Sequence, residues 1–341
     1  MFLKKMTWKP LNRRPSIIAA AFIIAIILLV FLTFKAAVVG SIDVGFGQLL
    51  RGLFSREDAT VNTVIDVRLP RIFIAILAGA ALAVSGTLLQ AVMKNPLTDP
   101  GIIGISSAAA LVGTLVTALF PALFFSVPLL SVIGGLGAYF LIYSLAWDGG
   151  VQPTRLILVG VALNLTFTGI AEAISAASGG GMTATQSIVS GNIAQKTWED
   201  VRLLAIYAGL TLIVALATAH ICNLLNLDDK TARGLGVAVD RNRFIVAFIA
   251  IILASISTSV VGIIGFLGLI VPHIARHLVG ADHRILLPFS MLLGAFIMLL
   301  SDTIGRVICY PYEISAAVIM AVCGGPFFII LLKMKGKGHG Y

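Results

Sequence analysis

Most of this chain consists of long apolar runs that contain no Asp, Glu, Lys or Arg. The first extends from Ser16 to Phe34 and the last from Ile314 to Leu332. A helix needs roughly 20 mostly apolar residues to cross the hydrocarbon core of a membrane, and several runs reach that length. The chain is 59% apolar and 11% charged, whereas a soluble domain has about 45–50% apolar and about 25% charged residues. The sequence therefore predicts an all-α integral membrane protein.

The apolar runs predict about ten transmembrane helices, several of them short or broken. The run 100–147 is long enough for two helices, with a turn between Pro121 and Pro128. The run 244–275 is short for two full spans, so we expect two short helices joined around its glycines, Gly262, Gly265 and Gly268. The remaining spans are expected at 16–34, 72–93, 156–178, 203–225, 285–301 and 314–332.

The distribution of basic residues predicts the orientation of these spans. With ten spans, sixteen of the 24 Lys and Arg residues lie on the side of the two chain ends, as the positive-inside rule favours. We therefore expect both termini in the cytoplasm and an uncleaved first span. The whole chain, 1–341, is predicted to be one polytopic membrane domain. Its cytoplasmic parts are a basic N-terminus (1–15), a charged loop (223–243) and a C-terminal tail (333–341).

Charge and cysteine content exclude several other classes of protein. The formal charge of +9 is dispersed among the apolar segments, so no basic domain exists to bind nucleic acid. Cys222, Cys309 and Cys323 form no CxxC pair and lie in or near spans. They predict neither a disulfide framework nor zinc chemistry.

One Asn-Pro pair, Asn95-Pro96, and one Asp-Pro pair, Asp99-Pro100, interrupt the apolar pattern between Lys94 and Gly104. Proline removes a backbone donor and disfavours the helical region for the residue before it. The segment is therefore either a plain cytoplasmic turn or a structured re-entrant element, and composition favours the turn.

The same region carries a recognisable signature, RLPRIFIAILAGAALAVSGTLLQAVMKNPLTDPGIIGISSAAAL. It resembles the permease subunits of iron-siderophore, haem and cobalamin ABC importers. The resemblance continues through SGNIAQKTW, LNLDDKTARGLGV, GIIGFLGLIVPHIARHLVGADHRILLP, LLSDTIGR and GGPFFIILLK, and so covers nearly everything from 68 to 333. The chain departs from the family pattern at Ala108, Ser315 and Ala317, in positions where helices pack.

The resemblance implies a multi-pass subunit of the cytoplasmic membrane, surrounded by lipid, that translocates cargo without being an enzyme itself. Its implied partners are two cytoplasmic ATP-binding subunits, an extracytoplasmic substrate-binding protein and a second permease subunit, identical or paralogous. We expect ferric siderophore as cargo. Cobalamin and haem stay open, because selectivity in this family rests largely in the binding protein. No cofactor is expected.

Three arginines flank the second and ninth predicted spans. Taken alone, Arg68, Arg71 and Arg306 indicate interfacial anchoring or, for Arg306, an i,i+4 pair with Asp302. In the family, arginines at these positions dock acidic residues on the two lobes of the binding protein. The guanidinium fork suits this role, because it matches the geometry of a carboxylate.

The charged segment 226–237 lies between two long apolar runs. Asn226 or Asp228 could cap a short helix that Gly234 or Gly236 ends, and the segment could simply be a solvated connector. In the family, the matching loop rests in a cleft of the ATPase and couples it to the permease. The residues expected to do so are Asp229, Ala232, Arg233, Gly234 and Gly236.

The fifth predicted span carries two candidate pathway residues. Thr154 lies at its cytoplasmic mouth, where the family closes its inner gate, and could alternatively cap a helix beginning near Leu156. Asn164 could face the pathway or bond to a neighbouring helix.

Other chemistry is weakly supported. His273 and His277 are four residues apart, but a metal site usually needs three or four ligands. Glu172 lies within a span without an evident partner, which is thin support for a proton relay or an ion-coupled secondary transporter. The chain has no G-x-x-x-x-G-K-[ST] phosphate loop. A receptor or scaffold without transport stays open.

Overall fold

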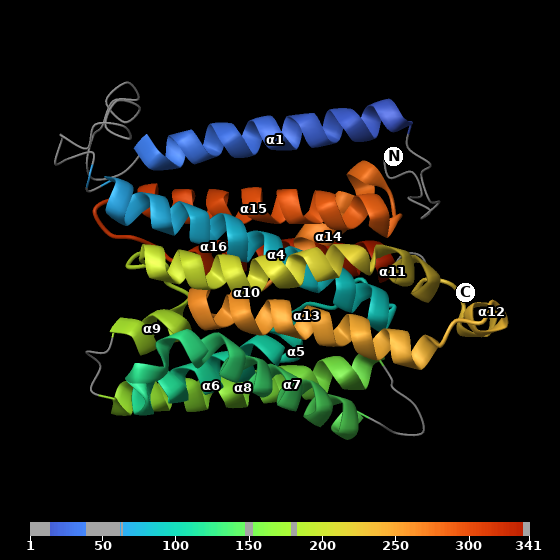
Figure 1. Cartoon of the computed structure of the whole chain (residues 1–341), viewed down its shortest axis with the longest axis horizontal. Helices are drawn as coiled ribbons and strands as arrows, with labels where there is room; N and C mark the ends of the chain where they lie inside the picture. Colours follow the sequence, from blue (N-terminus) through green and yellow to red (C-terminus); the bar gives the residue numbers. More distant parts are fainter. Residues whose placement is uncertain (1–13, 39–61, 63, 147–152, 179–182, 337–341) are drawn as a thin grey trace.

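The computed structural model describes residues 14–38, 62, 64–146, 153–178 and 183–336, and these fold into a bundle of helices without strands (Figure 1). Most of the predicted basic N-terminus and the end of the predicted C-terminal tail lie outside the described residues. The helices are α1 (Pro15–Val38), η1 (Val64–Arg68), α4 (Leu69–Met93), α5 (Pro100–Ile103), α6 (Ile105–Leu119), η2 (Pro121–Ser126), α7 (Val127–Ala146), α8 (Pro153–Ala177), α9 (Thr183–Ser190), α10 (Trp198–Ala217), α11 (Ala219–Leu225), α12 (Asp229–Gly234), α13 (Val239–Val261), α14 (Leu267–Val279), α15 (His283–Val307) and α16 (Ala316–Gly336).

The described part of the chain contains seven helices that are long and apolar enough to cross a membrane. It also contains three shorter apolar helices, α6, α14 and α16. Together these helices fall where the sequence predicts spans, including the division of the run 100–147 by η2. The predicted all-α membrane fold is confirmed.

Two predicted spans differ from the structure in part. The predicted span 203–225 is two helices, because α10 starts at Trp198 with a capping box between Thr197 and Asp200 and ends before Thr218. The Thr218 hydroxyl donates to the Ala215 carbonyl at 2.6 Å, and α11 starts one residue later. The run 244–275 divides into two helices at its glycines, as predicted, since α13 ends at Val261 and α14 begins at Leu267. Only α14, with 13 residues, is short, because α13 has 23.

The helices run back and forth between two ends of the bundle. The end of α1, the start of α4 and the end of α15 lie at the left in Figure 1, and we call this the arginine end after Arg68, Arg71 and Arg306. The opposite end, at the right, carries α12, the start of α1 and the end of α16, and we call it the α12 end.

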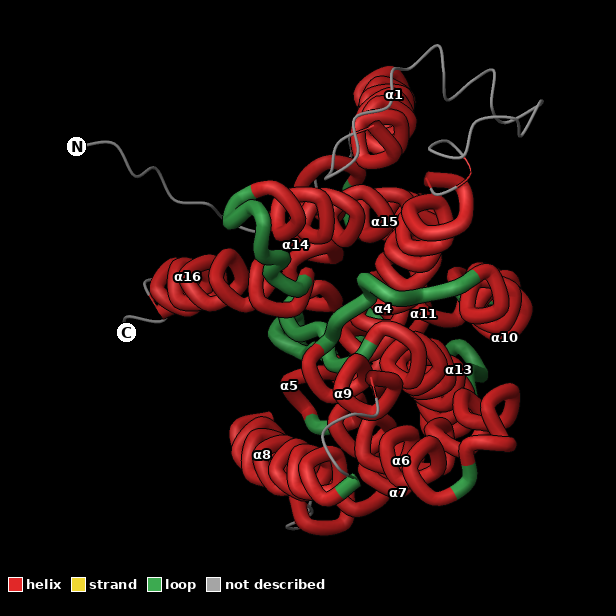
Figure 2. The backbone as a smooth tube through the Cα atoms, turned by 90° about the vertical axis from the view of Figure 1, so that its left-hand side faces the viewer, coloured by secondary structure: helices red, strands yellow, loops and turns green. Residues whose placement is uncertain are grey.

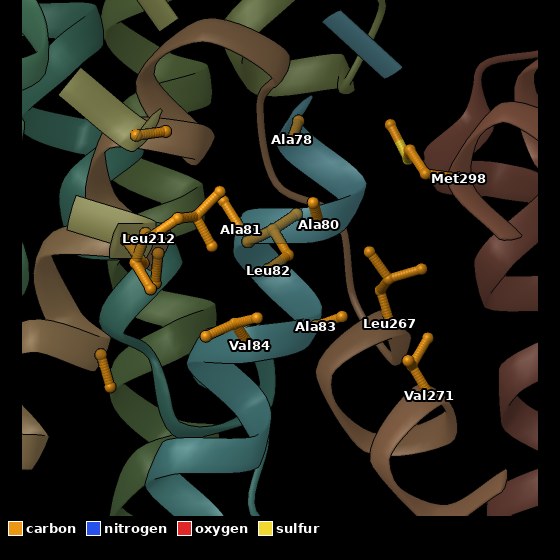
Figure 3. Close-up of a cluster of buried hydrophobic side chains, with 14 of the residues drawn as sticks. Ala78, Ala80, Ala81, Leu82, Ala83, Val84, Leu212, Leu267, Val271 and Met298 are labelled. Carbon is orange, nitrogen blue, oxygen red and sulfur yellow. The ribbon is translucent and has the colours of Figure 1, made fainter. Parts of the chain in front are cut away.

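Helix α4 forms the centre of the bundle, and α1 lies at its periphery (Figure 2). Among the residues of an 18-residue apolar stretch, 83% are buried in the span Ile65–Met93, which contains α4, and 11% are buried in α1. Figure 3 shows the alanine-rich middle of α4 facing residues of neighbouring helices, such as Leu212, Leu267 and Met298. The exposed apolar surface of α1 is consistent with contact to lipid.

Small residues permit the close contact between α4 and α15. A Cβ atom at Gly79 would lie 2.4 Å from the Gly294 carbonyl oxygen, and one at Gly294 would lie 2.4 Å from the Ala83 Cβ. No larger side chain fits there without moving a helix, so Gly79 and Gly294 serve tight helix packing.

Candidate functional site

At the arginine end, Arg71 is held by two carboxylates from distant parts of the chain. Its Nε and Nη2 atoms contact the Asp302 carboxylate at 2.8–3.1 Å, and its Nη1 lies 2.7 Å from Glu313 Oε2. Asp302 is fully buried, whereas the Glu313 side chain is 44% exposed. Arg71 thus has one interior partner and one partner that water can reach.

The other two arginines bind the end of α1. Arg68 Nη1 donates to the carbonyls of Ala37 and Val38 at 3.1 and 3.2 Å. Arg306 Nη1 donates to the Ala36 carbonyl at 3.1 Å, and its Nε lies 3.4 Å from Asp302 Oδ2. The predicted i,i+4 pair between Arg306 and Asp302 is therefore confirmed. These bonds satisfy helix-terminal carbonyls that otherwise lack partners.

The structure thus brings Arg68, Arg71 and Arg306 together at one end, as three buried side chains engaged in internal contacts. Docking of an external carboxylate at this cluster stays a prediction.

At the α12 end, the predicted short helix is present between the seven-residue α11 and the long α13. The Asp228 side chain caps α12 by accepting from the Lys230 N–H, which confirms one of the two predicted caps. The helix closes with bonds from Gly236 N–H to the Arg233 carbonyl and from Val237 N–H to the Ala232 carbonyl. Gly236 has φ +79°, the left-handed conformation that this closure requires and glycine adopts at low cost.

Among the five predicted coupling residues, Asp229 forms ion pairs with two different side chains. Its Oδ1 lies 2.6 Å from Lys94 Nζ and 2.7 Å from Arg243 Nη2. Hydrogen bonds from Lys94 and Arg243 lower the pKa of Asp229 to about 2. Arg233 pairs with Asp240 at 3.1 Å with both side chains exposed, and Ala232 is buried under the helix. Their role in coupling stays a prediction.

Side chains of α11 join the α12 end to the turn before α15. The Asn223 side chain accepts from the His283 N–H at 2.8 Å and donates to Asp282 Oδ1 at 2.6 Å. Helix α11 therefore holds a fixed place beside α15, and α12 follows it after Leu225.

The segment between Lys94 and Gly104 is a structured element, and the prediction of a plain turn is wrong. Thr98, Asp99 and Pro100 are buried, and Asp99 Oδ1 accepts from the N–H groups of Gly101 and Ile102 at 2.8 and 3.1 Å. The two prolines end α4 and start α5, and the Asp99 cap satisfies backbone donors that would otherwise be unpaired in the interior.

Helix α5 contacts α8 through the backbone. Gly104 has φ +93°, and a Cβ atom there would lie 3.2 Å from the Gly160 carbonyl oxygen and 3.3 Å from the Asn164 nitrogen. Asn164 is partly buried, and its Oδ1 has no hydrogen-bond partner among the residues that the structure describes. Thr154 lies in the first turn of α8, which begins at Pro153, so a cap before Leu156 is wrong. Neither pathway role is tested.

The remaining candidates have ordinary surroundings. The rings of His273 and His277 lie 4.9 Å apart, and that of His273 also contacts Phe327. Within the described residues, no group of three or more His, Cys, Asp or Glu side chains could hold a metal ion. Glu172 is exposed on α8.

Sequence reasoning missed several residues of these clusters, namely Lys94, Asp99, Arg243, Asp302 as a partner of Arg71, and Glu313. The Asp99-Pro100 pair carries a usable signal, since Asp before a helix-starting proline is a favoured N-cap. The contacts of Arg71 carry no local signal, because its two partners lie 231 and 242 residues away.

Comparison with known proteins gives consistent results. Residues 24–334 match the model of the FecCD transport family. The chain is 40% identical over 318 residues to the "Probable heme-iron transport system permease protein IsdF" of Staphylococcus aureus strains MSSA476 and Newman, covering 93% of this chain and 97% of each relative.

Two solved structures share the architecture. The first is an inward-facing metal-chelate-type ABC transporter, with a TM-score of 0.75 and 30% identity over 94% of this chain and 99% of that one. The second, PsaBC from Streptococcus pneumoniae, has a TM-score of 0.57 and 16% identity over 84% and 95%, and it supports the fold alone.

Proposed function

The chain belongs to the FecCD transport family and is a permease of the ABC-importer type, and from that premise we propose that it carries an iron chelate across the cytoplasmic membrane. The observation that carries the proposal is the family match over 24–334, combined with a short capped helix, α12, at one end of a bundle of apolar helices.

We propose haem iron and ferric siderophore as the two candidate cargoes. The sequence favoured a siderophore, and the name of the relatives that are 40% identical favours haem, an alternative that the sequence left open. Both are large, iron-bearing chelates. They suit a wide path with few specific contacts, because the binding protein performs most of the selection.

The basic residues at the α12 end support an orientation of the bundle in the membrane. The α12 end carries Lys94, Lys230, Arg233, Arg241 and Arg243 within or beside α12 and the start of α13. Basic residues concentrate on the cytoplasmic side of membrane proteins. We therefore place the α12 end in the cytoplasm, where it meets two ATP-binding subunits, and the arginine end outside, where it meets the substrate-binding protein.

Helix α8 is the proposed contact with the second permease subunit and one wall of the pathway. Its outer surface exposes Leu158, Leu165 and Ile170 at 65%, 69% and 45%. An identical or paralogous α8 would bury these side chains and enclose a path that Asn164 and Thr154 line. Movement of α12 by the ATPase then opens and closes the cytoplasmic mouth.

Uptake into proteoliposomes tests this proposal. The permease is reconstituted with its ATP-binding subunits and binding protein, and uptake of haem and of ferric siderophore is measured in separate and in competing assays. We expect uptake of one iron chelate that requires ATP inside and persists with a protonophore. Uptake that survives ATP depletion and collapses with the protonophore would instead indicate an ion-coupled secondary transporter.

A further inference from the structure

Lys94 adopts a backbone conformation that is unfavourable for lysine. It ends α4 with φ 48° and ψ 32°, in the left-handed region. Glycine, and to a lesser degree asparagine, is the usual residue at such a helix end, because a Cβ atom there lies too close to the following carbonyl oxygen. A lysine in this conformation is unusual, so the contacts of its side chain are of interest.

The side chain of Lys94 reaches the coupling segment. Its Nζ donates to the Leu227 carbonyl and to Asp229 Oδ1, both at 2.6 Å. Leu227 precedes the cap of α12 and Asp229 is the first residue of that helix. The Lys94 ammonium group therefore binds the start of α12 through two residues that lie 133 and 135 positions further along the chain.

Arg243 holds the same carboxylate oxygen from another direction. Its Nη2 lies 2.7 Å from Asp229 Oδ1, and it belongs to the first turns of α13. Helix α12 thus has ionic connections to two elements. Asp229–Arg243 and Arg233–Asp240 lead to α13, and Asp229–Lys94 leads to the end of α4.

The connection through Lys94 continues directly into the interior. Four residues after Lys94, Thr98 accepts from Gln90 Nε2, and the buried Asp99 caps α5. Helix α5 ends at Gly104, whose backbone touches α8 beside Gly160 and Asn164. A displacement of Lys94 has a short route to α8 through residues 95–104, which are partly buried up to Leu97 and mostly buried from Thr98 onward.

We propose that the Lys94–Asp229 ion pair is the link that transmits movement of α12 to α5, and through α5 to α8. Lys94 is thereby a positioning residue for transport, and Arg243 holds the carboxylate in place for it. The proposal rests on the proposed function, since it assumes that the ATP-binding subunits move α12.

The exposure of the pair suits a link that is remade in each cycle. The Lys94 and Asp229 side chains are 32% and 39% exposed, so water can solvate both charges when they separate. A fully buried pair would resist separation, because the free charges would stay desolvated. The ion pair can therefore separate and re-form as α12 moves, and it does not hold α12 in a single position.

The test compares two substitutions of Lys94 in the complete reconstituted complex. Lys94→Gly removes the ammonium group and also relieves the left-handed backbone. Lys94→Met removes the ammonium group and leaves the backbone cost in place. We expect both variants to assemble with the ATP-binding subunits and to hydrolyse ATP, and cargo transported per ATP to fall about five- to tenfold in both, the size of a modest coupling between sites.

Two further variants sharpen the result. Lys94→Arg restores a cation of similar reach and should recover most of the transport per ATP. Arg284→Met removes a charge of the same sign from an exposed position in the first turn of α15, outside the coupling segment, and should leave the ratio unchanged. Because Lys94→Gly favours the turn, it keeps the experiment informative if Lys94→Met folds poorly.

The proposal is overturned if Lys94→Gly transports as much cargo per ATP as the wild-type complex, or if Arg284→Met lowers the ratio as far. The wild-type complex is measured first. Failure of wild-type uptake would reject the proposed function, whereas normal wild-type uptake with an unaffected Lys94→Gly variant would reject the link alone.

Discussion

The charged groups at the arginine end and at the α12 end differ in how far they are removed from water. Asp302 is fully buried and the side chains of Arg71 and Arg306 are 6% and 5% exposed, whereas Asp229 and Lys94 are 39% and 32% exposed. Buried partners are costly to separate, because each charge left behind stays desolvated. Exposed pairs separate easily and contribute little stability. We therefore expect the ion pairs at the arginine end to persist, and those at the α12 end to separate and re-form when α12 moves.

The largest expected effect is loss of stability on neutralising Asp302. Asp302→Asn leaves the buried Arg71 and Arg306 without their shared carboxylate, and removing one partner of a buried pair costs about 3–5 kcal/mol. We expect a large drop in the midpoint of thermal unfolding in detergent. A variant as stable as the wild type would show that the arginine end is not held by this carboxylate, and the comparison would fail.

A second large effect is expected on uptake when Arg68 is reversed in charge. Arg68→Glu should abolish cargo uptake in proteoliposomes, because it repels the acidic partner expected at this end, while the ATP-binding subunits still copurify. Arg68→Gln is the matched control for the bonds to α1, since its amide still donates to the carbonyls of Ala37 and Val38 but carries no charge. Full transport by Arg68→Glu would reject docking at this end.

A smaller effect is expected at the one exposed partner of this cluster. Glu313→Gln should change the free energy of unfolding by no more than about 1 kcal/mol, because Arg71 keeps Asp302 and Glu313 is open to water. Denaturant unfolding in parallel with Asp302→Asn provides the measurement. Similar losses in the two variants would mean that burial does not separate the two carboxylates.

The smallest effect is expected for pH at the α12 end. The pKa of Asp229 lies at about 2, below its ordinary 3.8, so its contribution is complete above about pH 4 and is lost only as the pH falls toward 2. Binding of the ATP-binding subunits should therefore not change between pH 5 and pH 8 through this residue. The binding of wild-type and Asp229→Asn permease is compared over that range, and a change confined to the wild type would contradict the assignment.

Much of the fold could be predicted from sequence, because apolar runs and proline positions are local signals. They placed the apolar helices, the break before Pro128 and the cap of α12 at Asp228. The break at Thr218 was missed, since a threonine inside an apolar run gives no sign that its hydroxyl will bond to the preceding turn.

The candidate site was less predictable. The pairing of Arg306 with Asp302 follows from helical spacing, but that of Arg71 with Asp302 and Glu313 depends on how α4, α15 and the loop after α15 pack. Asn95-Pro96 and Asp99-Pro100 indicated a turn, and they gave no sign that the segment would be buried against α8 and α14. Contacts of this kind are set by tertiary packing, which periodicity does not encode.

The central claim is that this chain is moved by separate ATP-binding subunits acting at α12. It is tested most directly by measuring uptake of radiolabelled iron chelate into proteoliposomes that hold the permease alone or with those subunits, with and without internal ATP. We predict accumulation only when the ATP-binding subunits, the binding protein and ATP are all present. Accumulation against a gradient by the permease alone would contradict the account.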